Sequence, residues 1–171
     1  MKNQKVLFLT QAAMIAALYV VLTFVANAFR LASGAIQVRL SEMLAILPFF
    51  TPAAIPGVYI GCLLANLLTG ACLLDILVGS LASLIGALGA YALRRWKWAV
   101  PLPTILANAL IVPFVLIHGY GVPDAWWYLV LTVGAGEVIS CGILGMILLF
   151  SLQKYAVRIF GTSHKSSPIS R

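Results

Sequence analysis

Glu137 is the residue that says most about the chemistry of this chain. It lies near the middle of Trp126–Phe150, a stretch that is otherwise free of charged side chains and is long enough to cross a lipid bilayer. An ionised carboxylate at that depth is costly unless it faces a cavity or a partner group. The chain contains only four acidic residues. We therefore expect Glu137 to face a binding site and not lipid.

Asn108 is the polar side chain expected to share that site. It lies on the preceding apolar stretch, Pro101–Ile117, which runs in the opposite direction. At a rise of about 1.5 Å per residue, both side chains lie roughly 14–17 Å from the same membrane surface, and Gly134 and Gly136 leave room beside Glu137. A carboxylate next to an amide can read the N–H groups of a guanine-like edge. Glu137 could equally hold a ligand amine or a proton, and Asn108 could simply hydrogen-bond to Glu137 and join the two helices.

Residues 30–42 form the longest non-apolar connection between the apolar stretches. One interpretation makes this connection a lid over the site, in which Arg39 and Glu42 reach inward and a Ser33-Gly34 turn permits movement. The other leaves Arg39 at the membrane interface and has Ser41 cap the next helix. The sequence leaves both interpretations open.

Asp75, Asn66 and Trp127 are further candidates for the outer mouth of the site. Asp75 begins an apolar stretch, so it is either a helix N-cap or a second acidic group near Asn66 and Thr69. Trp127 either stacks on a planar ligand or belongs to the aromatic belt at the membrane surface.

Residues for catalysis or metal binding are scarce. The chain has two histidines, His118 and His164, and it contains no HExxH, GxSxG or paired-acid motif. An enzyme within the membrane would need a base, a nucleophile or a metal set. We therefore predict no catalytic residues, no metal site and no cofactor, which argues against an intramembrane enzyme.

The composition identifies the environment of these residues. Of the 171 residues, 63% are hydrophobic and only 9% are charged, and the mean hydropathy is +1.06. A soluble domain of this size cannot bury so much apolar surface. The net charge of +7 does not indicate nucleic-acid binding, because the basic residues flank apolar stretches and do not cluster with aromatic residues on one face. The sequence predicts an integral membrane protein in the lipid bilayer.

Six apolar segments are candidate membrane spans. They are Val6–Phe29, Ser41–Phe50, Ile55–Leu68, Asp75–Leu93, Pro101–Ile117 and Trp126–Phe150. The first, fourth and sixth are long enough for about 30 Å of hydrocarbon. The second and third span only about 15 and 21 Å as α-helices, so neighbours must shield them, or irregular backbone must break or extend them. We predict an all-α, compact six-transmembrane-helix bundle over residues 1–160, followed by a polar tail over residues 161–171.

The basic residues predict the orientation of this bundle. If the N-terminus is inside the cell, nine of the eleven Lys and Arg residues lie on the cytoplasmic side, and only Arg30 and Arg39 lie outside. This distribution follows the positive-inside rule. We expect a multi-pass protein of the plasma membrane with both termini in the cytoplasm.

Four stretches of this chain resemble a known family of transporters. They are AAMIAALYVVLT, IQVRLSEMLAILPFFTPAAIPGVYIGCLLANLLTG, LLDILVGSLASLIGAL and LPTILANALIV. Together they make the chain similar, from about Ala12 to Leu148, to the S-components of energy-coupling factor (ECF) transporters, and most of all to the queuosine-precursor transporter family. The VRLSE and LPFFTPAAIPG blocks are the most specific parts.

The resemblance implies a function and partners. It implies a six-helix S-component that binds a micronutrient from outside, here a 7-deazaguanine such as preQ0, preQ1 or queuine, and docks on a membrane T-component with two ATPase subunits. It also implies that an Ala-x-x-x-Ala motif in the first helix faces the T-component, and that residues 30–42 are the lid. Small residues at this spacing equally suit packing within the bundle. The alternatives are an S-component for another vitamin and a proton-coupled secondary transporter that uses Glu137. The motif corresponds to one of two pairs, Ala12/Ala16 or Ala13/Ala17.

Overall fold

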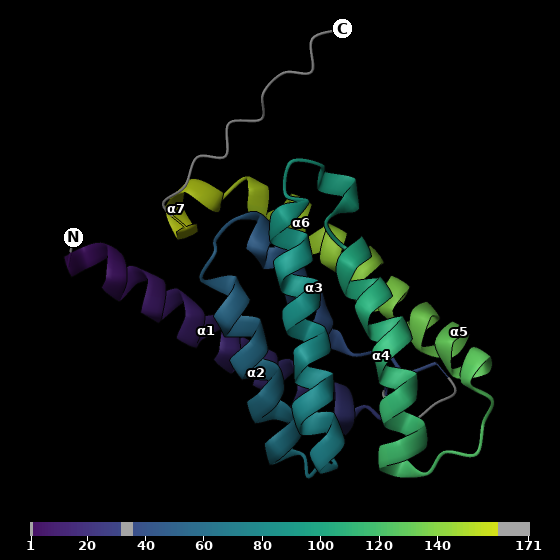
Figure 1. Cartoon of the computed structure of the whole chain (residues 1–171). Coiled ribbons are helices and arrows are strands. Elements are labelled where there is room, and N and C mark those ends of the chain that lie inside the picture. Colours follow the sequence, from purple (N-terminus) through teal and green to yellow (C-terminus); the bar gives the residue numbers. More distant parts are fainter. Residues whose placement is uncertain (1, 32–35, 161–171) are drawn as a thin grey trace, which may run out of the picture.

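The computed structural model describes residues 2–31 and 36–160, and these form a helical bundle (Figure 1). Its helices are α1 (Lys2–Ala28), η1 (Leu40–Phe49), α2 (Ala54–Leu68), η2 (Asp75–Gly79), α3 (Ser80–Ala92), η3 (Lys97–Ala99), α4 (Leu102–Tyr120), α5 (Trp126–Glu137), η4 (Val138–Leu144), α6 (Gly145–Gln153) and α7 (Ala156–Phe160). Helix η2 continues directly into α3, and α5, η4 and α6 form one continuous helix. The predicted Ser33-Gly34 turn and the polar tail from residue 161 lie outside the described residues.

Four continuous helices within the described residues are long and apolar enough to cross a membrane. They cover Gln4–Ala28, Asp75–Ala92, Lys97–Tyr120 and Trp126–Gln153. Three such spans were predicted from the sequence, because the fifth apolar segment was expected to end at Ile117, whereas α4 continues to Tyr120. The prediction of an all-α membrane protein is confirmed. The count of six crossings stays a prediction, since η1 and α2 are shorter than the four long helices.

The short helix η1 is shielded by its neighbours. It is a 3-10 helix of 10 residues with Pro48 inside it, and most of its side chains are buried. The tighter coil rises about 2.0 Å per residue, so η1 is longer than an α-helix of the same number of residues. It packs against α1, α3, η4 and α6. Because these neighbours surround it, a segment too short to cross a bilayer as an α-helix lies in the core.

Small residues bring the outer helices close together. A side chain at Gly61 of α2 would lie 2.7 Å from Cβ of Tyr19 and 3.0 Å from Cα of Ala16, both on α1. A side chain at Gly86 of α3 would lie 2.7 Å from Oγ1 of Thr104 on α4. Small residues at these two helix contacts therefore serve packing within the bundle.

Two helices contain π-helical segments, and each adjoins a buried acidic residue. Helix η2 begins at Asp75, and η4 begins immediately after Glu137. A π turn contains an extra residue, so it changes which side of the helix the following residues face. Such turns are frequent at functional sites.

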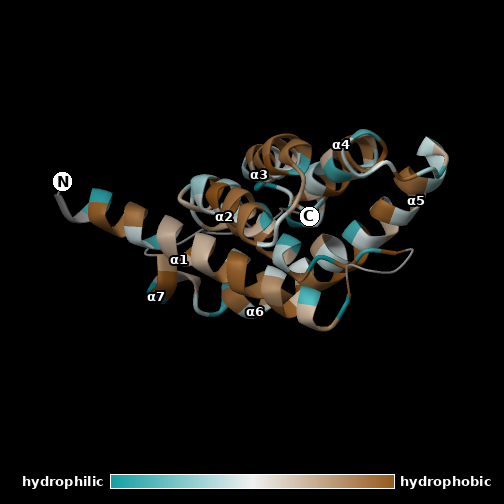
Figure 2. Cartoon of the chain, turned by 90° about the horizontal axis from the view of Figure 1, so that it is seen from below, coloured by the Kyte–Doolittle hydropathy of each residue, from teal (hydrophilic) through white to brown (hydrophobic). Residues whose placement is uncertain are grey.

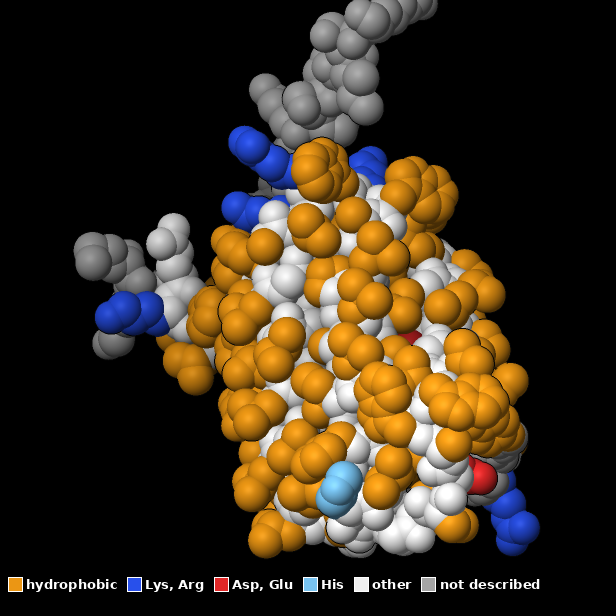
Figure 3. All heavy atoms as spheres, turned by 45° about the vertical axis from the view of Figure 1, so that its right-hand side comes forward, with side chains coloured by type: hydrophobic (Ala, Val, Ile, Leu, Met, Phe, Trp, Pro, Cys, Tyr) orange, Lys and Arg blue, Asp and Glu red, His pale blue; other side chains and the backbone are white. Residues whose placement is uncertain are grey.

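The two ends of the bundle differ in how many Lys and Arg residues they carry, and the sides of the bundle are apolar. Hydrophobic residues predominate along the helices in Figure 2 and cover most of the face shown in Figure 3, where Lys and Arg gather mainly at one end. The connection between α3 and α4 and helix α7 lie at that end, and the α2–η2 and α4–α5 connections lie at the other (Figure 1). The apolar sides agree with a membrane protein, and the cytoplasmic placement of the termini stays a prediction.

Candidate binding site

A polar cavity lies at the end of the bundle formed by the α2–η2 and α4–α5 connections. Its volume is about 420 Å³, which is within the range of about 300–1,000 Å³ usual for small-molecule sites. Three of the predicted site residues line it: Arg39, Asn66 and Asp75. The cavity wall also contains Tyr19 and Tyr120. Polar groups and aromatic rings thus surround a space large enough for a planar heterocycle.

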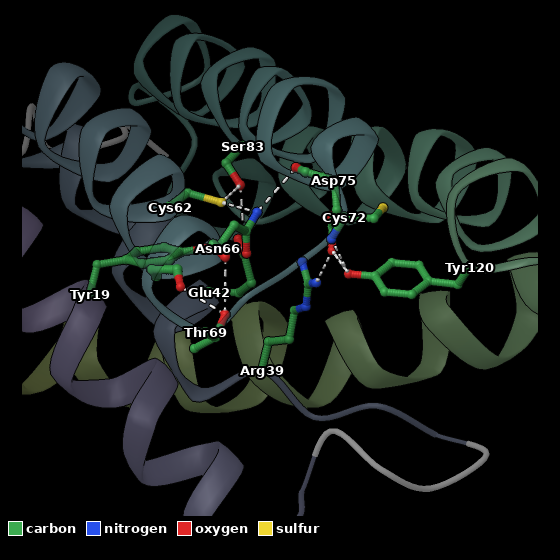
Figure 4. Close-up of polar contacts among 11 residues, drawn as sticks. Tyr19, Arg39, Glu42, Cys62, Asn66, Thr69, Cys72, Asp75, Ser83 and Tyr120 are labelled. Carbon is green, nitrogen blue, oxygen red and sulfur yellow. Dashed lines mark hydrogen bonds and ion pairs between the residues drawn. The ribbon is translucent and has the colours of Figure 1, made fainter.

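Asp75 is the centre of the polar contacts in this wall (Figure 4). Its Oδ2 lies 3.6 Å from Nη2 of Arg39 and accepts a hydrogen bond of 2.9 Å from the hydroxyl of Tyr120. The side-chain amide of Asn66 donates to the backbone carbonyl of Asp75 at 3.1 Å. The prediction of an N-cap is wrong, because Asp75 makes no capping hydrogen bond and its helical turn begins earlier, at Leu73. The alternative, an acidic group near Asn66 at the mouth of a site, describes its position.

Arg39 reaches into the bundle and not along the membrane interface. Its side chain is 24% exposed and extends toward Asp75 (Figure 4). Ser41 does not cap the helix that follows, since no side chain makes a capping hydrogen bond at the start of η1. Ser41 is buried and lines the cavity. Of the two interpretations of this connection, the structure supports the inward one for Arg39.

Glu42 lies behind the cavity wall. It is fully buried, and its Oε1 accepts hydrogen bonds from the hydroxyls of Tyr19 and Ser83. Its Oε2 is buried without a hydrogen-bond partner. Because Tyr19 both lines the cavity and donates to Glu42, this tyrosine connects the cavity to the carboxylate.

Glu137 points into the bundle, but it does not line the cavity. It is 3% exposed, so it does not face lipid. Asn108 lies beside it, as the comparison of depths predicted, and Glu42 and Arg39 lie near enough to interact electrostatically. Oε2 of Glu137 and both polar atoms of the Asn108 side chain are buried outside hydrogen-bonding geometry with any partner. Asn108 is near enough to interact with Glu137 through its side chain, so the simpler interpretation, in which Asn108 joins the two helices, stays open.

Gln37 lines the cavity, and its backbone packs against Gly136, the residue before Glu137. Gly136 lies directly against the carbonyl of Gln37, so closely that any side chain at Gly136 would collide with it. Gln37 also lines both the large cavity and a second one of about 240 Å³, and Leu116 and Val122 are shared by the two. The segment before η1 thus forms a partition within one larger polar region.

Trp127 takes no part in this region. It is 65% exposed, packs edge-on against Tyr128 and lines neither of these two cavities. Its position favours the aromatic-belt interpretation. Sequence reasoning missed Tyr19. The signal for Tyr19 was a tyrosine within an otherwise apolar and alanine-rich helix, where a buried hydroxyl requires a partner.

No cluster of His, Cys, Asp and Glu suitable for a metal ion occurs among residues 2–31 and 36–160. The polar region can therefore be described by its hydrogen-bonding groups alone: carboxylates, one guanidinium, amides and hydroxyls. Such groups bind and orient a ligand that offers N–H donors.

Comparison with known proteins identifies the family. The family model described as "QueT transporter" matches residues 9–154. The chain belongs to the QueT transporter family. The printed description of the family is that of a transporter, which agrees with the resemblance seen in the sequence.

One relative of this QueT-family chain is the queuosine precursor transporter QueT of Lactococcus lactis subsp. cremoris (strain MG1363). The two are 38% identical over 98 residues, which is 57% of this chain and 57% of the relative. The match thus spans little more than half of the relative's length. No solved structure matches this chain.

The two Ala-x-x-x-Ala pairs of this QueT-family chain differ in exposure. Ala16 is buried against Gly61 of α2, and the backbone of Ala12 approaches Gly57 of the same helix. Ala13 and Ala17 are exposed. The first pair is thus engaged in packing within the bundle, and the second is free for a partner or for lipid.

Proposed function

We propose that this chain is the substrate-binding S-component of an ECF-type importer and that it takes up a 7-deazaguanine precursor of queuosine. The observation that carries the proposal is the polar cavity centred on Asp75, at the end of the bundle opposite the main group of basic residues. Under the positive-inside rule that end faces the exterior. The family and the name of its relative supply the substrate class.

The cavity wall has the groups that a deazaguanine needs. The pyrimidine edge of a deazaguanine carries an N–H and an exocyclic amino group side by side. A carboxylate such as that of Asp75 can accept hydrogen bonds from both groups. Asn66 supplies an amide at the same wall, and the rings of Tyr19 and Tyr120 supply surfaces for stacking. The ligand would therefore be held by its edge and by its face.

Glu137, Asn108 and Glu42 form the inner part of the proposed site. In this proposal they become accessible when the segment around Gln37 moves away from Gly136. This movement would join the region around Glu137 to the cavity. This movement gives residues 30–42 the role of a lid. Trp127 stays at the membrane surface in this proposal.

Transport itself requires partners. We assign docking on the T-component and its two ATPases to the exposed pair Ala13 and Ala17, because Ala12 and Ala16 already contact α2. A flat strip of small residues lets another helix approach closely.

The first test is thermal unfolding of the detergent-purified protein with preQ0, preQ1, queuine and a panel of vitamins. A ligand that binds only the folded state raises the melting temperature. We expect the deazaguanines to do so. Stabilisation by another vitamin and by none of the deazaguanines would assign a different substrate.

Calorimetry then tests the inner part of the site. Glu137→Gln should weaken deazaguanine binding by more than tenfold, since a hydrogen bond to a charged group contributes about 1.5–3 kcal/mol. Unchanged affinity would remove Glu137 from the site.

The second candidate is a proton-coupled secondary transporter. Its supporting observation is that Glu137 is buried and makes no direct ion pair with any residue that the structure describes, as expected of a residue that carries a proton. Uptake into proteoliposomes separates the two candidates. The S-component requires the partner subunits and ATP, whereas the secondary transporter works alone with a proton gradient.

A further inference from the structure

A chain of buried hydrogen bonds runs from the cavity wall to Glu42 (Figure 4). The side-chain amide of Asn66 donates to the backbone carbonyl of Asp75 at 3.1 Å and lies 3.8 Å from Sγ of Cys62. The hydroxyl of Ser83 lies 3.4 Å from the same sulfur and 3.3 Å from Oε1 of Glu42. Asn66 lines the cavity. Cys62, Ser83 and Glu42 are at most 1% exposed, so the chain joins the wall to a carboxylate behind it.

The donors of this chain all point toward Glu42. Ser83 has one proton, and a carboxylate is a stronger acceptor than a sulfur atom, so Ser83 donates to Glu42. The oxygen of Ser83 can then accept the S–H of Cys62, and the sulfur can accept the second N–H of Asn66. Tyr19 donates to the same carboxylate from the other side. Hydrogen bonds in such a chain polarise and strengthen one another.

The chain also connects separate elements of the bundle. Cys62 and Asn66 lie one turn apart on α2, Ser83 lies on α3, and Glu42 lies in the first turn of η1. The three elements pack against one another. The orientation of Glu42 is therefore set by two helices other than its own.

We infer that Cys62 and Ser83 are positioning residues, which hold the carboxylate of Glu42 in a fixed orientation relative to Asn66 and the cavity wall. The inference rests on the proposed function, in which the cavity and Glu42 belong to one binding site. Cys62 and Ser83 act through Glu42 and Asn66 and do not themselves touch the ligand.

Cys141 shows what distinguishes Cys62 from a cysteine that only fills space. Both thiols are buried, and a free cysteine usually packs as a small hydrophobic residue. The hydrogen bond printed for Cys141 is a long contact of 4.0 Å with the backbone carbonyl of Pro101. Cys62 instead has polar side chains on two sides, Ser83 and Asn66. Cys141 is therefore the matched control for Cys62.

Calorimetry with preQ1 on the purified full-length chain tests the inference. We expect Cys62→Ala and Ser83→Ala each to weaken binding by about 3- to 10-fold, the effect of one hydrogen bond between neutral groups. Cys62→Ser should restore most of the affinity, because a hydroxyl also donates and accepts. Cys141→Ala should bind as the wild type does. Melting temperatures of the variants without ligand show that the protein is folded in each measurement.

The S–H stretching band in the infrared spectrum tests the same chain without a ligand. Donation of a hydrogen bond weakens the S–H bond and lowers its frequency. The band of Cys62 is identified by its disappearance in Cys62→Ala. We expect this band to move to higher frequency in Ser83→Ala, because that variant removes the acceptor.

Three results would overturn the inference while leaving the proposed function intact. The first is wild-type affinity in both Cys62→Ala and Ser83→Ala. The second is a Cys62→Ser variant that binds no better than Cys62→Ala, as a role in packing alone would produce. The third is a band of Cys62 that stays in place in Ser83→Ala. Failure of the wild type to bind preQ0, preQ1 or queuine would instead refute the proposed function.

Discussion

The carbonyl oxygen of Gln37 rests directly on Gly136, one residue before Glu137 in the sequence. No residue other than glycine fits there, because a Cβ atom would collide with that carbonyl group. This contact holds the segment before η1 against α5. The contact therefore links the proposed lid to the helix that contains Glu137.

Gly136→Ala should displace the lid from α5. Overpacking of this kind costs about 1–3 kcal/mol, and we expect it to appear as faster dissociation of a bound deazaguanine, measured by rapid mixing. Gly134→Ala is the matched control on the same helix, because its Cβ would have only an ordinary contact of 3.6 Å, with Cβ of Ala109. Equal dissociation rates in the two variants would argue against the lid.

Asp75→Asn should lower both stability and affinity. The variant keeps the shape of the side chain but leaves the guanidinium of Arg39 without its 3.6 Å partner. Since Arg39 is 24% exposed, water offsets part of the loss, and we expect a cost of about 1–3 kcal/mol. Thermal unfolding and calorimetry measure the two effects. Tyr120→Phe removes only the 2.9 Å hydrogen bond to Asp75 and should lower stability and affinity less. If Tyr120→Phe lowered them more than Asp75→Asn, the ion pair between Arg39 and Asp75 would not be the main contact of this wall.

Gly79→Ala should disturb Asp75 without changing any charged residue. A Cβ atom at Gly79 would collide with Oδ1 of Asp75, so the carboxylate must shift from its position beside Arg39. We expect a loss of stability of about 1–3 kcal/mol and weaker ligand binding. Gly142→Ala provides the control, because Gly142 also lies in a π-helical segment and its Cβ would approach no atom closer than 3.7 Å. Similar melting temperatures for both variants would contradict the prediction.

Ala13→Leu and Ala17→Leu should abolish uptake and leave ligand binding unchanged. Both positions are exposed on α1, so added bulk interferes with a docked partner and not with the bundle. Ala16→Leu should act differently: its side chain is buried against α2, and the substitution should lower the melting temperature. Uptake in vesicles that contain the partner subunits, together with calorimetry, distinguishes these outcomes. Normal uptake by Ala13→Leu and Ala17→Leu would place the docking surface elsewhere.

The amino-acid sequence was sufficient for the class of protein and for most of its helices. Long apolar runs interrupted by Pro, Gly and charged residues define membrane helices, because hydrocarbon leaves the backbone few other conformations. A lone carboxylate in such a run must turn inward for the same reason, and Glu137 does so. The proximity of Asn108 followed from helix rise alone.

Only the tertiary structure decided which polar residues meet in the cavity. The 3-10 helix η1 and the π segments η2 and η4 do not have 3.6 residues per turn, so the faces presented by Glu42 and Asp75 cannot be read from an α-helical period. The partition at Gln37 depends on a contact between residues about a hundred positions apart. Local sequence specifies the lengths and polarity of the helices, whereas the pairing of Asp75 with Arg39 and the contact of Gln37 with Gly136 arise only when distant segments pack together.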